Sequence, residues 1–150
     1  MGELKDRLHD DMISAMKARD ELRTATLRMV LTAIGTEEVA GKVARSLSAE
    51  EELKVLGREA KKRREAAEAF RSGGAEARAQ RELDEEQILA AYLPVQLSDD
   101  ELGALVAAAV AQTGASGPQA MGAVMKVVGP QVAGRADGGR VAAAARAALG

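Results

Sequence analysis

The chain has 150 residues, of which 21 are basic and 23 acidic, so its formal net charge at pH 7 is −2. The absence of cysteine and the presence of one histidine exclude disulfides, thiol nucleophiles and cysteine-based zinc sites, and argue against a Ser-His triad. One Tyr, one Phe and no Trp leave almost no platform for stacking bases. Any binding of nucleic acid must therefore come from a local basic surface.

The two ends of the chain carry no targeting or membrane signal. The first residues, MGELKDRLHD, have mixed charge and no apolar stretch, and the apolar stretches near the other end are interrupted by Gly, Pro and Arg. These patterns are not those of a secretory signal or a membrane-spanning helix. We therefore expect a cytoplasmic protein that does not enter a membrane.

The first half of the chain has helical periodicity throughout. A stripe at every fourth residue predicts the first helix: Leu4, Leu8, Met12 and Met16. Asp20 suits the N-cap of a second helix, whose wide apolar face indicates packing on two sides. Ser48 and Glu51 have the spacing of a capping box at the start of a third, and Gly73-Gly74 suits its end. A fourth helix is expected to run to about Tyr92.

The second half predicts shorter helices. Ser98 and Glu101 repeat the capping-box pattern, and the helix that follows should end near Thr113-Gly114. Pro118 suits the first position of another helix, Gly129-Pro130 is expected to break the chain, and Asp137 suits the N-cap of a last helix. No window alternates with period two, so we predict an all-α fold without a sheet.

Composition places a boundary in the middle of the chain. All three prolines follow Tyr92, and residues 1–92 hold most of the charged residues. Pro94 also disfavours a helical conformation for the residue before it. We predict an N-terminal domain of long helices at 1–92, a linker at 93–97, and a small C-terminal helical bundle at 98–150.

The densest basic run is a candidate RNA-binding cluster on the third helix, formed by Lys61, Lys62, Arg63 and Arg64. The alternative is a solvated helix face, because Glu59, Glu65 and Glu68 lie four residues from members of the cluster and can form weak ion pairs with them. Composition by itself favours the solvated face.

A second candidate is the segment from Gly134 to Arg140. Its glycines, Gly134 and Gly138 among them, allow a ligand to approach the backbone, and the helix that Asp137 would cap offers free N–H groups to an anion. Arg135 and Arg140 add positive charge. The segment has no known phosphate-loop pattern, so tight turns between short helices are the alternative explanation.

The acidic clusters and His9 do not predict a catalytic or metal site. Adjacent carboxylates such as Asp10-Asp11 and Glu85-Glu86 point in different directions when they lie on a helix. Acidic residues at helix starts are explained by the helix dipole. We expect no catalytic residue, no metal and no cofactor.

Several linked motifs, in order along nearly the whole chain, resemble the YqeY proteins. In the first half the resemblance lies in Leu8, Asp11-Met12, Ala15-Met16, Asp20, Arg23, Thr26-Leu27-Arg28-Met29, Ala33-Ile34 and Lys61-Lys62-Arg63-Arg64-Glu65. In the second half it lies in Tyr92-Leu93-Pro94, Gln96-Leu97-Ser98, Thr113-Gly114-Ala115, Met121-Gly122, Val124-Met125 and Gly134-Arg135-Ala136-Asp137-Gly138.

That family is similar to the C-terminal tail region of GatB, a subunit of tRNA-dependent amidotransferases, where the tail is associated with holding tRNA. The resemblance implies a stand-alone accessory protein that is not catalytic alone, although the family label is carbon-nitrogen ligase activity with glutamine as amido-N-donor. The implied partner is tRNA or a complex of tRNA with an amidotransferase or synthetase, and no DNA role is expected. Lysines are usual in the family where this chain has Gln131, Ala133 and Gly139, and a glycine where it has Lys126, so Lys126 and Arg140 are candidate compensating contacts.

Two other functions compete with tRNA binding. A helix-docking protein-interaction module without RNA is consistent with Met121 and Met125, which can line an adaptable apolar groove or simply fill a core. An amidotransferase acting alone needs a nucleotide site and a source of ammonia, for which the sequence offers no motif.

Overall fold

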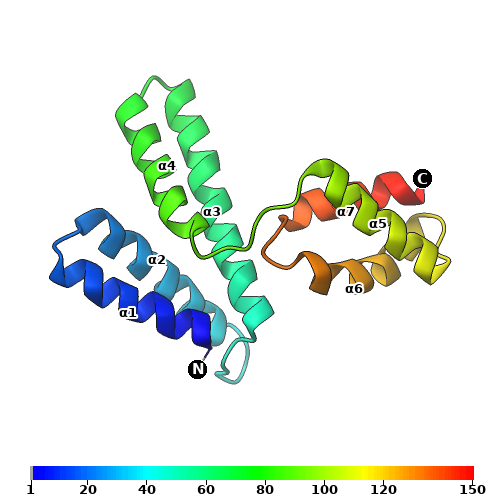
Figure 1. Ribbon diagram of the computed structural model, residues 1–150, viewed down its shortest axis with the longest axis horizontal. Coiled ribbons are helices and arrows are strands. Elements are labelled where there is room, and N and C mark those ends of the chain that lie inside the picture. The colour runs from blue at the N-terminus through cyan, green and yellow to red at the C-terminus, as the bar shows by residue number, and fades with distance from the viewer. Residues whose placement is uncertain (1) are drawn as a thin grey trace. The chain divides into compact units, whose positions relative to one another are not determined.

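The computed structural model describes residues 2–150 of the protein. These residues form seven α-helices and one short 3-10 helix, with no strand among them (Figure 1). The all-α fold expected from the sequence is confirmed. The chain divides into two compact units, Met1–Pro94 and Val95–Gly150, which we call the N-terminal unit and the C-terminal unit.

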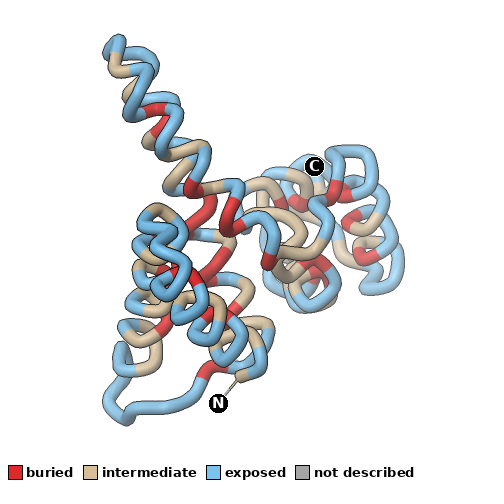
Figure 2. The backbone as a smooth tube through the Cα atoms, turned by 60° about the vertical axis from the view of Figure 1, so that its left-hand side comes forward, coloured by how far each residue is buried: buried red, intermediate tan, exposed pale blue. Residues whose placement is uncertain are grey.

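The N-terminal unit consists of two helical hairpins. They are formed by α1 (Glu3–Lys17) with α2 (Glu21–Glu38) and by α3 (Ala49–Ser72) with α4 (Glu76–Ala90), and α2 also packs on α3 and α4. Fully buried side chains from all four helices form one core, among them Leu8, Leu27, Ile34, Leu56 and Leu89. Figure 2 shows buried positions gathered where the hairpins meet, whereas the far end of the α3–α4 hairpin is largely exposed.

Local signals fix where these helices begin. The Asp20 side chain accepts a hydrogen bond from the Arg23 N–H at 3.1 Å and caps α2. At α3 the Ser48 hydroxyl accepts from the Glu51 N–H at 3.1 Å while the Glu51 carboxylate accepts from the Ser48 N–H at 3.0 Å, which is the reciprocal capping box that the sequence predicts. Gly73 follows the last residue of α3 as its C-cap.

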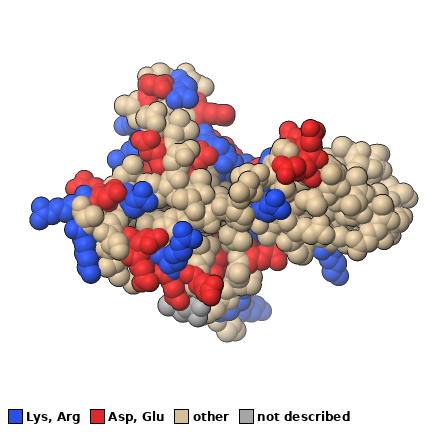
Figure 3. Space-filling model, viewed as in Figure 1, with Lys and Arg blue, Asp and Glu red and all other residues tan. Residues whose placement is uncertain are grey.

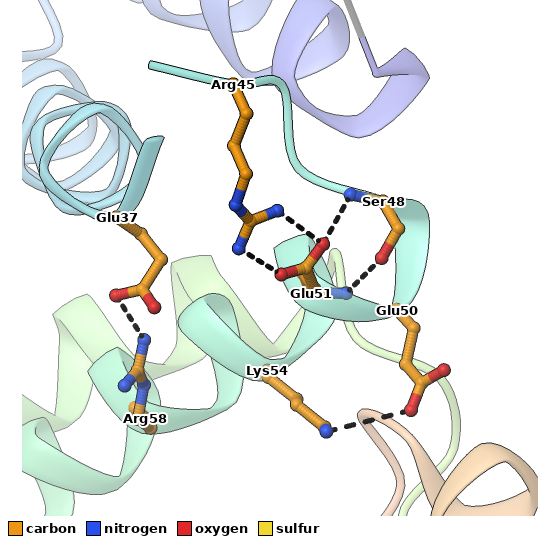
Figure 4. A network of polar contacts seen from close by, with 7 residues as sticks. All are labelled: Glu37, Arg45, Ser48, Glu50, Glu51, Lys54 and Arg58. Atoms are coloured by element: carbon orange, nitrogen blue, oxygen red, sulfur yellow. Dashed lines mark hydrogen bonds and ion pairs between the residues drawn. The ribbon is translucent and has the colours of Figure 1, made fainter. Parts of the chain in front are cut away.

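The loop between α2 and α3 is held by charged contacts (Figure 4). Arg45 donates to both oxygens of Glu51, with one N–O distance of 2.9 Å, so one carboxylate serves the loop and the capping box together. This Arg45 contact is the largest cause that lowers the pKa of Glu51 to about 2, with the Ser48 N–H second. Arg58 pairs with Glu37 at 3.4 Å across α3 and α2.

The C-terminal unit is a bundle of shorter helices. It comprises α5 (Asp99–Thr113), the 3-10 helix η1 (Pro118–Ala120), α6 (Met121–Val132) and α7 (Gly138–Leu149). Ser98 and Glu101 form a second capping box at the start of α5, and Gly114 ends α5 in the left-handed conformation with φ 65°. The core is built from small and branched side chains, including Leu102, Val106, Val124, Val128 and Val141.

Two details differ from the sequence predictions. Gly129-Pro130 does not break the chain, because α6 continues through Pro130 to Val132. Proline fits helical φ, and inside α6 its cost is the one hydrogen bond that its missing N–H would donate and a local clash with the preceding turn. Leu97, assigned to the linker by the sequence, is 5% exposed and belongs to the core of the C-terminal unit, and its N–H donates to the Arg135 carbonyl at 2.8 Å.

Within residues 2–150, no helix has both the length and the apolar character needed to cross a membrane.

Candidate functional site

The basic cluster predicted on α3 is neutralised by carboxylates. Each of its four residues has an acidic partner: Lys61 with Glu65 at 3.9 Å, Lys62 with Glu59 at 3.1 Å, Arg63 with Glu82 at 3.4 Å, and Arg64 with Glu86 at 3.3 Å. Two of these acids belong to α3 itself and two belong to the neighbouring helix α4. A phosphate that approached this face would have to compete with carboxylates already in place.

Arg63 is the least accessible member of the cluster. Its side chain is 19% exposed, lies between Glu82 and Glu85 of α4, and also contacts the Met29 sulfur of α2 at 3.1 Å. Burial, reinforced by the negative charge of Glu85, raises the pKa of Glu82. Arg63 therefore joins three helices, and we assign it a structural role alongside its predicted RNA contact.

The second predicted site, the segment from Gly134 to Arg140, is tied to the backbone that precedes α5. The Arg135 Nε donates to the Val95 carbonyl at 3.2 Å, and Gln96 donates to the Gly134 carbonyl at 2.7 Å. Arg140 donates to the Leu97 carbonyl at 3.0 Å and to Asp99 at 2.7 Å. The guanidinium groups of both arginines thus already donate hydrogen bonds to acceptors of the C-terminal unit.

The remaining predicted residues of the C-terminal unit have separate roles. Asp137 caps α7 by accepting from the Arg140 N–H at 3.1 Å, so part of the helix N-terminus is occupied. Gly134 adopts φ 72°, which requires glycine or costs strain, and Gly138 is the exposed first residue of α7. Lys126 is exposed on α6 and has no ion pair with any residue from 2 to 150.

A basic surface that the sequence analysis missed lies at the turn between α1 and α2. We call it the turn surface and define it by Lys17, Arg19, Arg23 and Arg28, all of which are exposed. Figure 3 shows Lys and Arg side chains gathered over this turn, at the left of the view. Only Arg23 has an acidic partner within the described chain, Asp20 at 3.3 Å. These four residues do not form a run in the sequence. The turn between α1 and α2 brings them together.

Arg19 holds an unusual backbone conformation at the tip of this turn. Its φ is 58°, the only positive φ of a non-glycine residue among those described. The Arg19 and Asp20 N–H groups close the end of α1 by donating to Met16 and Ala15 carbonyls at 3.1 and 2.9 Å. Glycine is the usual residue in this left-handed position, and other residues there cost about 1–2 kcal/mol. The turn therefore holds an arginine in a conformation that usually selects glycine.

Next to the turn surface, a groove runs along α2. It is lined by Ala25, Arg28, Met29, Thr32 and Ala33 of α2 and by Glu59 of α3, and its volume is about 480 Å³. Its lining is mostly apolar, and Arg28 and Glu59 are its two charged residues. The groove lies wholly within the N-terminal unit.

The most deeply buried acidic residue, Glu52, lies against the start of α1. Glu52 is 1% exposed and its burial raises its pKa, while the Lys5 N–H in the first turn of α1 acts in the opposite direction. A Cβ at Gly2 would overlap the Glu52 carboxylate in its present position. In the described part of the chain, no three His, Asp or Glu side chains gather as metal ligands would.

The tyrosine of the chain closes the N-terminal unit. The Tyr92 hydroxyl, just beyond α4, donates to Asp11 of α1 at 2.5 Å, and the Arg7 guanidinium lies 4.6 Å from the ring centroid. Burial and the adjacent Asp11 carboxylate raise the pKa of Tyr92 to about 12. The hydroxyl is therefore held protonated as a hydrogen-bond donor and not as a nucleophile.

These features define a class of protein: two small helical units whose polar chemistry lies in charged surfaces and in an open groove. The family of Yqey-like proteins matches residues 5–149, which is nearly the whole chain. The chain belongs to the YqeY family. No curated protein matches it closely enough to add a named relative.

Proposed function

We propose that this YqeY protein is an accessory module that binds tRNA, or a complex of tRNA with an amidotransferase or synthetase, through the phosphate backbone and has no catalytic activity of its own. The family membership supports the association with tRNA, by way of the resemblance to the GatB tail. The turn surface is the observation that carries the proposal, because it offers cations that no carboxylate of the described chain neutralises.

Phosphate binding depends on cations that are free to exchange water and counterions for the ligand. Lys17, Arg19 and Arg28 meet this requirement, since none has an acidic partner within 2–150. The α3 cluster and the arginines near Gly134 meet it less well, because their donors already hold carboxylates or carbonyls. We therefore rank the turn surface above the two predicted sites as the phosphate contact.

The test measures binding of tRNA by the whole chain over a range of salt concentrations. The double variant Lys17→Gln, Arg19→Gln should weaken binding and reduce the slope of log K against log salt by roughly one unit for each phosphate that the variant no longer binds. The matched double variants Lys61→Gln, Lys62→Gln and Arg135→Gln, Arg140→Gln should have smaller effects. If the α3 variant weakens binding more than the turn variant, the ranking of the surfaces is wrong.

Arg19→Gly separates loss of charge from loss of structure. Glycine relaxes the left-handed backbone at φ 58°, so this variant should be at least as stable as the parent and still bind tRNA less tightly. A parent protein with no salt-sensitive tRNA binding would overturn the proposal in favour of a helix-docking module without RNA. Amidation of Glu-tRNA or Asp-tRNA by the purified chain with ATP and glutamine would overturn its non-catalytic part.

A further inference from the structure

The groove along α2 combines an apolar lining with one carboxylate that is nearly buried. Ala25, Met29 and Ala33 supply apolar surface, and Glu59 from α3 supplies the acidic group. Glu59 lines this groove although it is only 6% exposed, and its carboxylate pairs with Lys62 at 3.1 Å. Met29 is held in place by Arg63, whose guanidinium lies 3.1 Å from its sulfur.

Arg28 gives the groove a planar cation at its border with the turn surface. Its one side-chain partner within residues 2–150 is the Met16 sulfur at 3.8 Å, a weak contact that leaves the guanidinium free to stack on a flat ligand. The groove is shallow and largely open to solvent, with a volume of about 480 Å³, so a flat ligand can lie along it. A ligand that fits these features is flat, has apolar faces, and carries N–H donors along one edge.

Among the four RNA bases, guanine meets the last requirement best. Its Watson–Crick edge carries two adjacent N–H donors, which one carboxylate accepts with both oxygens, whereas the other bases offer one donor group on that edge. We propose that the α2 groove binds an unpaired guanine of an RNA loop, with Glu59 accepting from the base edge and Arg28 covering its face. This inference rests on the proposed function.

A helix of a protein partner fits the groove less well. An apolar side chain in the groove would take the remaining water from the Glu59 carboxylate without replacing its hydrogen bonds, which is unfavourable. A basic side chain would meet both Arg28 and Lys62, the latter 3.1 Å from Glu59. A base with a donor edge avoids both penalties. Unstacked bases read on this edge are also the usual targets of sequence-specific RNA recognition.

The experiment uses RNA hairpins with one stem and a loop in which a single guanine is replaced by inosine, adenine or cytosine. Inosine lacks the amino group and keeps the ring N–H, so it isolates one of the two donors. The whole chain should bind the guanine hairpin about tenfold more tightly than the adenine or cytosine hairpin, with inosine between them. Equal binding of all four, with salt dependence intact, overturns the guanine site and leaves phosphate binding standing.

Two variants locate the preference. Glu59→Gln should remove the discrimination between guanine and adenine hairpins, and Glu65→Gln, on the exposed face of the same helix, should retain it. Because Glu59 is buried, Thr32→Phe provides a second variant, in which an exposed groove residue is enlarged to fill the site. Discrimination that survives both Glu59→Gln and Thr32→Phe would show that the groove does not bind the base.

Failure of the proposed function has a different result. If no hairpin binds, the salt-dependent RNA contact fails, and the groove is then tested with the free nucleotides GMP and AMP by NMR. GMP should shift the backbone amide signals of Ala25, Thr32 and Ala33 more than AMP does. Absence of such shifts, or equal shifts by both nucleotides, overturns the guanine site.

Discussion

The two units use the same devices to start their helices but different chemistry to pack them. The N-terminal unit buries three carboxylates, those of Glu52, Glu59 and Glu85, and half-buries Arg63 beside Glu85. The buried residues of the C-terminal unit are leucine, valine and alanine only, within the described chain. Charge is therefore part of the interior in the first unit and confined to the surface in the second.

This difference has a physical consequence for function. Long helices with ionic groups between them can present cations and carboxylates at fixed places, such as Arg28 and Glu59 along one groove. Small apolar side chains pack short helices closely but leave few charged groups to present. Ligand chemistry is therefore expected in the N-terminal unit, although the most site-like glycine-rich segment of the sequence lies in the other.

The largest expected effect tests whether the two cores are independent. Leu56→Ala in the first core and Leu102→Ala in the second each remove a fully or almost fully buried leucine, at 0% and 2% exposure. Each should lower the free energy of unfolding by about 3 kcal/mol. Urea unfolding followed by NMR should show each substitution moving the transition of its own unit only. A common shift of both transitions by either variant would contradict the division.

The next effect concerns the hydrogen bond that closes the first unit. Tyr92→Phe removes the hydrogen bond to Asp11 and should cost about 1.5 kcal/mol, because the acceptor is a charged group. With the pKa of Tyr92 raised to about 12, this stability is complete below pH 10 and disappears as the pH rises from about 10 to 12. Tyr92→Phe should therefore be less sensitive than the parent to alkaline unfolding. If alkaline pH destabilises the parent and Tyr92→Phe equally, the alkaline sensitivity comes from a group other than Tyr92.

A smaller effect uses the motif that the units share. Ser48→Ala and Ser98→Ala each remove the hydroxyl of a capping box with the same 3.1 Å hydrogen bond. Each should cost about 1 kcal/mol in its own unit, as judged from the same urea transitions. Ser46→Ala, in the exposed loop before α3, is the control and should change neither transition.

The sequence predicts the parts of the fold that depend on local signals. Asp20, Ser48 and Ser98 mark helix starts because a side chain and a nearby N–H interact within three residues, and all three caps are confirmed. The predicted break at Gly129-Pro130 is wrong. A Gly-Pro pair is common at helix ends, but the pair alone does not show whether the helix stops there or continues. Proline keeps helical φ and removes a single backbone hydrogen bond, a cost that the packed helix α6 bears.

The candidate site depends on contacts between helices, which spacing does not reveal. The sequence suggests partners for the basic cluster at four-residue intervals, and the Lys61 and Glu65 pair agrees with this. Arg64 instead pairs with Glu86 of α4, and Arg63 with Glu82. Neutralisation across a hairpin thus follows from the packing of α3 on α4, and the groove follows from the packing of α3 on α2.

The smallest expected effect separates the two capping boxes by their response to acid. Glu51 accepts from Arg45 as well as from the Ser48 N–H, and its pKa falls to about 2, whereas Glu101 has no such arginine clamp and owes its lowered pKa chiefly to the Ser98 N–H. A carboxylate with a lowered pKa stabilises the folded state above about pH 4.5 and loses this contribution as the pH falls through its folded value. The box at α3 should therefore persist to more acidic conditions than the box at α5.

NMR titration of the two glutamate side chains between pH 2 and pH 6 checks this order directly, with Glu101 expected to take up its proton first as the pH falls. Arg45→Met should raise the pKa of Glu51 and leave that of Glu101 unchanged, because it removes the arginine hydrogen bonds and keeps the Ser48 box. If Glu51 titrates no lower than Glu101 in the parent, the clamp between the loop and α3 does not hold in solution. The two units would then share one acid response at their caps, and only the buried carboxylates would distinguish them.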